Sequence, residues 1–183
     1  MQSTETPGMD VIQRNFFRIL SSGAFNSQSN IEPMSPFKWR RLMQMVDAQQ
    51  VIPVFVKGIS KHSLDEGLRL PDSIIDDIKA RMNDNRTLSG KVPEKVKLSS
   101  RLLNHRLKGI INNELHSIDT SIEALDILKL IVSNSQSMLT RGMDLDGIIT
   151  LGQYLRTRGD KVDFVKLDAW LSSLMLHPMA ELQ

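Results

Sequence analysis

The amino-acid sequence predicts an all-α protein, a multi-helix bundle of about eight helices, from three observations. Apolar residues recur three and four positions apart in most segments, which is the spacing of one helix face. Cap residues and prolines precede several of these segments, as they do at helix starts. The chain shows no alternating strand pattern, no Asn-Gly hairpin and no internal repeat.

The N-terminal part of the chain contains two helix starts. Residues 1–9 are predicted to be a disordered lead-in, and Asp10 is predicted to cap a helix over 11–23 that Gly23 ends. Ser35 is predicted to cap a second helix over 36–50, with proline at its first position. One face of this second helix carries Trp39, Leu42, Met43 and Val46, whereas Lys38, Arg40 and Arg41 lie away from it.

The next segments lead to a linker. Residues 51–62 have β propensity, but Pro53 is unfavourable inside a central strand, so a short helix beginning near Pro53 is predicted. Another helix is predicted to begin at Pro71. Gly90 and Pro93 mark a linker after it. We expect a single helical domain over 10–183, with a seam between two halves at 87–95.

The C-terminal part is predicted to be helical throughout. A long helix is expected over 94–117, followed by one over 120–140 that Ser117 or Asp119 caps and Gly142 ends. Two further helices are expected over 145–158 and 164–176, with Asp144 and Asp163 as their caps, and Pro178 is expected to begin a final turn.

Composition excludes several classes of chemistry. The chain has no cysteine, which removes disulfides, zinc–thiolate sites and thiol nucleophiles. None of the four histidines has the spacing of a metal motif, and no glycine-rich phosphate loop or nucleophile elbow occurs. No apolar run approaches the ~18 residues of a membrane span, and the N-terminus lacks a signal-peptide pattern. We therefore expect a cytoplasmic protein without a metal or cofactor.

A cationic stripe is the first candidate site. Lys97, Arg101, His105 and Lys108 are expected on the long helix over 94–117, where they occupy a sector about 80° wide, because each residue turns the helix by ~100°. Such a row of cations can meet the phosphates of a nucleic acid or another polyanion. The alternative interpretation is an ordinary solvated helix face, which is the commoner outcome.

The pair Asp144 and Asp146 is the second candidate site. Metal-dependent phosphoryl transfer needs carboxylates that share one face, and residues two apart do so on a strand but not on a helix. The apolar residues after Asp146 follow helical spacing. The pair is therefore interpreted as a helix start, with Asp144 as the cap and Asp146 complementing the helix dipole.

Two regions of the chain resemble the helical flanks of a known family. Gln50-Val51, Gly58-Ile59 and Leu70-Pro71 in the first half, and Gly142, Val162-Asp163, Leu171 and Leu174 in the second, are the residues concerned. They resemble the helical N- and C-terminal regions of the uncharacterised nucleotidyltransferase-like family of Bacteroides-type bacteria. In that family a catalytic sheet separates the two regions, whereas the interval here holds one linker and one helix. The resemblance therefore implies no catalytic residue in this chain.

These observations lead to three functional hypotheses. The first is a non-enzymatic helical module that binds or regulates another protein, and the resemblance suggests a nucleotidyltransferase-like or surface-polysaccharide protein as the partner. The second is a protein that binds nucleic acid or another polyanion through the cationic stripe. The third is a diverged nucleotidyltransferase that uses Asp144 and Asp146.

Overall fold

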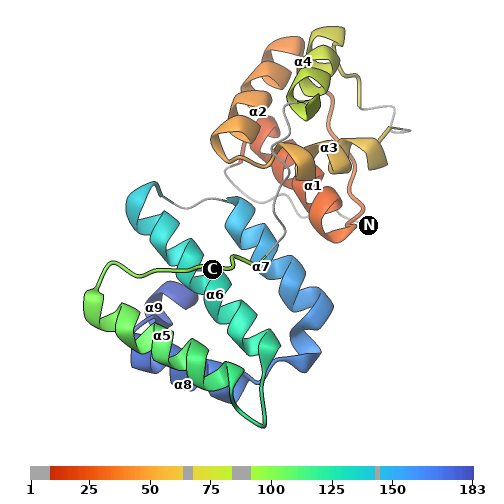
Figure 1. Cartoon of the computed structure of the whole chain (residues 1–183). Coiled ribbons are helices and arrows are strands. Elements are labelled where there is room, and N and C mark those ends of the chain that lie inside the picture. The colour runs from red at the N-terminus through yellow and green to blue at the C-terminus, as the bar shows by residue number, and fades with distance from the viewer. Residues whose placement is uncertain (1–8, 64–67, 84–91, 143–144) are drawn as a thin grey trace. The chain divides into compact units, whose positions relative to one another are not determined.

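The computed structural model describes residues 9–63, 68–83, 92–142 and 145–183, and side chains are described except at 81–83 (Figure 1). The described residues form nine α-helices, one short 3₁₀ helix and no strand. The prediction of an all-α fold is therefore confirmed, with one helix more than the expected eight. Residues 1–8 of the predicted lead-in and the capping residue Asp144 lie outside the described residues.

The chain divides into two compact units, Met1–Leu88 and Ser89–Gln183. The division falls inside the seam that the sequence indicated at 87–95. Each unit contains its own buried apolar side chains, which is what defines an independently packed region. That the two units form one domain stays a prediction.

The N-terminal unit contains four helices, α1 (Val11–Phe25), α2 (Pro36–Ala48), α3 (Ile52–Lys61) and α4 (Asp72–Asn83). Helix α1 packs against α2 and α3, and α3 also packs against α4. The predicted face of α2 is confirmed, because its four apolar members are all buried. The largest fully buried side chains of the unit are Trp39, Phe16, Phe55, Ile19 and Leu42.

Helices α1 and α3 approach each other through two glycines. A Cβ atom added at Gly23 would lie 2.0 Å from the backbone oxygen of Val54, and one added at Gly58 would lie 2.0 Å from the oxygen of Ile19. The prediction that Gly23 ends the first helix was therefore wrong. Gly23 lies inside α1, where its lack of a side chain lets the backbones meet, and the helix ends at Asn26 in the left-handed conformation with φ 60°.

Three of the predicted N-caps accept hydrogen bonds from the first turn of their helices. The Asp10 carboxylate accepts from the Gln13 backbone N–H at 2.8 Å, and the Gln13 side chain accepts from the Asp10 N–H at 3.2 Å, which makes a capping box. The Ser35 hydroxyl oxygen accepts from the Lys38 N–H at 3.4 Å, and the Asp163 carboxylate accepts from the Lys166 N–H at 3.0 Å. These bonds satisfy donors that the helices cannot pair internally.

The connection between α1 and α2 is attached to α1 by polar contacts. Asn15, which is fully buried, donates to the backbone oxygen of Glu32 at 2.8 Å and accepts from its N–H at 3.0 Å. The Glu32 carboxylate also pairs with Arg14 at 2.8 Å and with Arg18 at 2.7 Å, one turn apart on α1. Because both guanidinium groups favour the charged carboxylate, with the Arg14 hydrogen bond contributing most, the pKa of Glu32 falls from 4.5 to about 2.

The C-terminal unit is built around one long central helix. Its elements are α5 (Arg101–Leu115), α6 (Ile122–Thr140), α7 (Leu145–Arg158), a 3₁₀ turn η1 (Gly159–Lys161), α8 (Phe164–Leu174) and α9 (His177–Ala180). Helix α6 contacts α5, α7, α8 and α9, and its buried residues dominate the core (Figure 1). The predicted stop at Gly142 agrees with the structure, because α6 ends at Thr140 and Gly142 adopts φ 96°, which favours glycine.

Helix α5 begins later than predicted. Residues 94–100 were expected to be helical, but the helix starts at Arg101 with Ser100 as its N-cap. The side chain of Asn104 explains the difference, because it accepts from the Leu98 N–H at 2.7 Å and donates to the Leu98 oxygen. These two bonds, together with burial of the Leu98 side chain, replace the hydrogen bonds that a helix would have offered.

The start of α6 also differs from the prediction. Neither Ser117 nor Asp119 is its N-cap, and Ser121 occupies that position without a side-chain capping bond. Instead the Ser121 N–H donates to the buried carboxylate of Glu114 at 2.6 Å. The Glu114 carboxylate thus pairs the N–H of the N-cap residue, whereas no N-cap side chain accepts from the first turn of α6.

Candidate functional site

The cationic stripe is only partly helical. Arg101, His105 and Lys108 lie on α5 and are exposed, and at ~100° per residue they share one side of the helix. No ion pair joins any of the three to another described residue. The helical part of the stripe is therefore a row of three exposed cationic or titratable side chains.

Lys97 does not belong to that row as predicted. It is exposed, but it precedes the helix in the non-helical segment that Asn104 holds at Leu98. Helical periodicity would place Lys97 one turn before Arg101, but the backbone at Lys97 is not helical. The prediction of four stripe residues on one helix was wrong for this member.

Asp146 does not adopt the strand geometry that a metal clamp requires. Asp146 lies in the first turn of α7, which begins at Leu145, and Asp144 lies outside the described residues. Across the part of the chain that the structure describes, no three His, Asp or Glu side chains are grouped to hold a metal ion. Asp146 is thus placed where a carboxylate complements the helix dipole.

A serine, a histidine and an aspartate meet near the end of α8 without forming a catalytic triad. The Ser172 hydroxyl lies 2.9 Å from Nε2 of His177, and a carboxylate oxygen of Asp168 lies 3.5 Å from the same nitrogen. In a triad the two partners engage different ring nitrogens, so that the carboxylate orients the base. This arrangement is therefore an exposed polar contact between α8 and α9.

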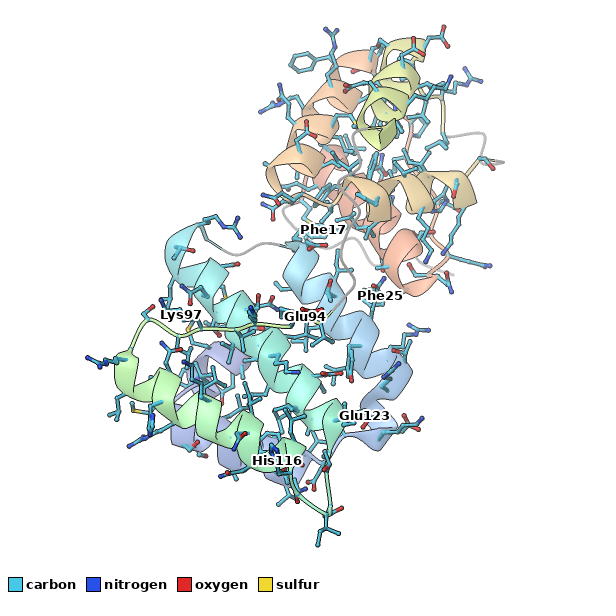
Figure 2. All side chains as sticks on the ribbon, in the orientation of Figure 1. Phe17, Phe25, Glu94, Lys97, His116 and Glu123 are labelled. Atoms are coloured by element: carbon cyan, nitrogen blue, oxygen red, sulfur yellow. The ribbon has the colours of Figure 1, made fainter. Side chains whose placement is uncertain are left out.

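Five large apolar side chains gather at one end of the C-terminal unit, where α5 ends and α6 and α8 begin. We call this set the apolar end, and its members have exposed fractions of 58% for Leu115, 108% for Ile118, 54% for Ile122, 55% for Phe164 and 83% for Val165. Figure 1 shows the α5–α6 loop and the start of α8 at the same end of the unit. Figure 2 labels His116 and Glu123 there, each next to a member in sequence. Scattered exposed apolar residues are ordinary, but a group of five at one place is typical of an interaction surface.

A buried carboxylate links the elements that carry the apolar end. Glu114 is 7% exposed, and its carboxylate accepts from the Ser121 N–H at 2.6 Å and from the Lys166 ammonium at 3.0 Å. Lys166 also donates to the backbone oxygen of Asp119, and the Asp163 N–H donates to the Ser121 hydroxyl at 3.4 Å. The end of α5, the loop, and the starts of α6 and α8 are thereby joined by charge-assisted hydrogen bonds.

The carboxylates around Lys166 favour the charged form of its ammonium group. The hydrogen bond to Glu114 raises the pKa of Lys166 most, and the nearby carboxylates of Asp119, Glu114 and Asp163 raise it further. Lys166 therefore stays charged at neutral pH. The hydrogen bonds of Glu114 and Lys166 hold the backbone segments that carry the five apolar side chains.

No pattern in the sequence indicated the apolar end as a whole. Ile118 lies in the α5–α6 loop and Ile122 begins α6, and Phe164 and Val165 follow directly after a cap residue. One signal was present, since at ~100° per residue Val165 lies about 160° around the helix from Leu167, outside the apolar face that Leu167, Leu171 and Leu174 share. The contact between the α5–α6 loop and α8 is a tertiary feature, and no local pattern predicts it.

Comparison with protein-family models, with curated proteins and with solved structures gives no match for this chain. The resemblance to the nucleotidyltransferase-like family therefore stays a prediction from the sequence. None of the helices in the described ranges is sufficiently long and apolar to cross a membrane.

Proposed function

We propose that this chain is a non-enzymatic interaction module whose C-terminal unit binds another protein through the apolar end. The observation that carries the proposal is that five exposed apolar side chains lie on segments joined by the hydrogen bonds of Glu114. Covering such a surface is favourable by roughly 25 cal/mol for each Å² of apolar area removed from water.

The chemistry of the apolar end is suited to protein binding. Ile118, Ile122 and Val165 are β-branched and lose little rotamer freedom when they are buried, and Phe164 offers a rigid aromatic anchor. The Glu114 carboxylate and the Ser121 N–H are already hydrogen-bonded to each other. A partner can therefore cover the surface without leaving these polar groups unpaired.

The proposed partner is a nucleotidyltransferase-like or surface-polysaccharide protein, as the sequence resemblance implies. A cytoplasmic location forms part of this proposal, and the absence of cysteine is compatible with such a reducing compartment.

A pair of matched variants tests the proposed function. The protein carrying Ile118→Ser and Val165→Ser is compared with one carrying Leu102→Ser and Leu139→Ser, which removes two exposed leucines elsewhere in the same unit. Proteins that co-purify with the wild type are quantified by mass spectrometry, and the strongest one is purified and titrated calorimetrically. We expect the first variant to weaken binding at least ten-fold, because the two lost side chains contribute about 1.4 kcal/mol or more.

Two results would contradict this function. One is that the purified partner binds the Ile118→Ser, Val165→Ser variant as tightly as the wild type. The other is that both serine pairs weaken binding equally, since this would trace the effect to general surface apolarity. Circular dichroism of each variant checks that its helices are retained.

Polyanion binding through α5 is a second candidate function, and the exposed, unpaired state of Arg101 and Lys108 favours it. If these residues contact phosphates, affinity for a nucleic acid should fall steeply with salt, because binding releases counterions. The Arg101→Glu, Lys108→Glu variant should then abolish binding. An affinity that changes neither with salt concentration nor in this variant would contradict the second candidate.

A further inference from the structure

The outer surface of α2 carries an exposed aromatic side chain among three cations. Phe37 is 62% exposed, and Lys38, Arg40 and Arg41 are exposed as well. At ~100° per residue, Phe37, Arg40 and Arg41 lie within a sector of about 100° that points away from the buried face. We call Phe37, Lys38, Arg40 and Arg41 the α2 outer surface.

Among the described residues, the cations of the α2 outer surface have no acidic partner. No described carboxylate pairs with Lys38, Arg40 or Arg41. On α1, by contrast, the two arginines that face Glu32 form ion pairs of 2.7 and 2.8 Å with it. The described residues of this unit thus include both a neutralised pair of arginines and a cluster of three cations without an acidic partner.

The dipole of α2 does not favour the position of these cations. All three lie in the first two turns of α2, and the first turn contains no acidic residue. The N-terminal end of a helix carries a partial positive charge that acts within the first turn, so Lys38 is unfavourable there by about 0.3–1 kcal/mol. Arg40 and Arg41, in the second turn, gain nothing from the dipole. Arg156 and Arg158, at the C-terminal end of α7, complement the dipole instead. Helix stability therefore explains the α7 arginines but not the α2 cations.

We propose that the α2 outer surface binds single-stranded nucleic acid. Arg40, Arg41 and Lys38 neutralise phosphates along the strand, and the ring of Phe37 stacks on an unpaired base. Cations that follow the backbone beside an aromatic platform are the two elements that sequence-tolerant single-strand recognition requires.

The structure favours this ligand over three others. A duplex hides the base faces on which Phe37 would stack. A membrane surface requires a free apolar helix face, but the apolar face of α2 is buried, with Trp39, Leu42 and Val46 each 0% exposed. An acidic peptide would pair with the cations but has no unpaired base to place against the ring.

Fluorescence anisotropy of the full chain with a fluorescein-labelled oligothymidylate or oligouridylate, measured across a sodium chloride series, tests the proposal. The wild type should bind, and the logarithm of its association constant should fall linearly with the logarithm of the salt concentration. Each of Arg40→Ala and Arg41→Ala should reduce that slope by about 0.7, the value for one lost phosphate contact on a single strand.

Phe37 provides the readout that a purely electrostatic surface would not give. Phe37→Ala should weaken binding about five-fold or more at every salt concentration and leave the slope unchanged, and Phe37→Tyr should restore it. Because Phe37 is exposed, this variant is expected to fold, and circular dichroism checks it. Lys57→Ala and Lys79→Ala, which remove exposed cations from α3 and α4, are the matched controls and should bind like the wild type.

Several outcomes would overturn the proposal. They are the absence of binding at low salt, tighter binding to a duplex of the same length, and Phe37→Ala binding like the wild type. Equal losses in the Lys57→Ala and Lys79→Ala controls would assign the signal to net charge. Association with phosphatidylserine vesicles that Phe37→Ala abolishes, without binding to the oligonucleotides, would assign the surface to membranes. Loss confined to the Arg101→Glu, Lys108→Glu variant would assign polyanion binding to α5 instead.

Discussion

At the scale of single residues, Tyr154 offers a direct test of the packing between α6 and α7. Its hydroxyl donates to the Asp126 carboxylate at 3.0 Å, and the Arg158 guanidinium lies 5.8 Å from its ring centroid. Burial, and then the hydrogen bond to Asp126, raise the pKa of Tyr154 from 10.0 to about 12. Tyr154 is the chain's single tyrosine, so its ionisation can be measured without labels.

We predict that the ultraviolet absorbance of the folded protein reports a tyrosinate midpoint near 12, and that Asp126→Asn lowers it. Burial is the larger cause, so the midpoint of this variant should stay above 10.0. Because the folded pKa exceeds the unfolded one, the stability linked to Tyr154 is complete below pH 10.0 and is lost as the pH rises towards 12. A midpoint near 10.0 in the folded wild type would contradict the described contact.

Glu32 has the opposite dependence on pH. Its folded pKa, about 2, lies below the usual 4.5, so the stability that it contributes is present above pH 4.5 and is lost as the pH falls towards 2. We predict that Glu32→Gln lowers the free energy of unfolding by ~1 kcal/mol near neutral pH, because solvent screens these half-exposed ion pairs. Urea unfolding across this pH range should show the difference between wild type and variant shrink with acidity. If the difference in free energy of unfolding stayed constant across this pH range, the charge of Glu32 would not be the cause of the difference.

At the scale of elements, the glycines of α1 and α3 are predicted to determine the stability of the N-terminal unit. Gly23→Ala or Gly58→Ala should lower its free energy of unfolding by ~2 kcal/mol or more, because the added Cβ would overlap backbone of the other helix. Gly109→Ala is the control, because a Cβ there meets nothing within 4 Å. It should stabilise the C-terminal unit by about 0.5–1 kcal/mol through its better helix propensity.

The two tryptophans allow these effects to be measured separately, since Trp39 lies in the N-terminal unit and Trp170 in the C-terminal unit. Replacing Trp170 by phenylalanine leaves a fluorescence signal from the first unit alone, and replacing Trp39 leaves one from the second. If alanine at Gly23 and at Gly109 changed stability by the same amount and sign, the close approach of α1 and α3 would be wrong.

Local interactions were predictable, whereas contacts between distant residues were not. Asp10, Ser35 and Asp163 were found because a cap acts within three residues of itself. Gly23 was misassigned as a stop because the backbone that it meets belongs to α3, later in the chain. The start of α5 was misplaced because nothing in periodicity shows that Asn104 will hydrogen-bond the backbone of Leu98.

The same distinction applies to the candidate sites. The cationic side chains of α5 could be predicted to share a face, because helical spacing alone decides it. The apolar end could not, because its five members come from three helices and a loop that the Glu114–Lys166 ion pair brings together. A buried carboxylate is recognised as a structural centre only after its partners are known.

At the scale of the whole molecule, the chain consists of two compact helical units with different surfaces. The N-terminal unit presents the α2 outer surface, which is cationic and aromatic, and the C-terminal unit presents the apolar end. We therefore expect the two units to bind chemically different ligands. This expectation separates the tests, because variants of one surface should leave binding at the other unchanged.

Site-specific photo-crosslinking tests the central proposal, protein binding through the apolar end, most directly. A photoreactive amino acid is placed at Val165 and, as the control, at Leu139, which is 70% exposed near the other end of α6 from Ile122. In living cells of the native host, position 165 should yield one dominant crosslinked protein that position 139 does not, and Ile118→Ser should reduce its yield. Equal crosslinking at both positions, or none at position 165, would contradict the proposal.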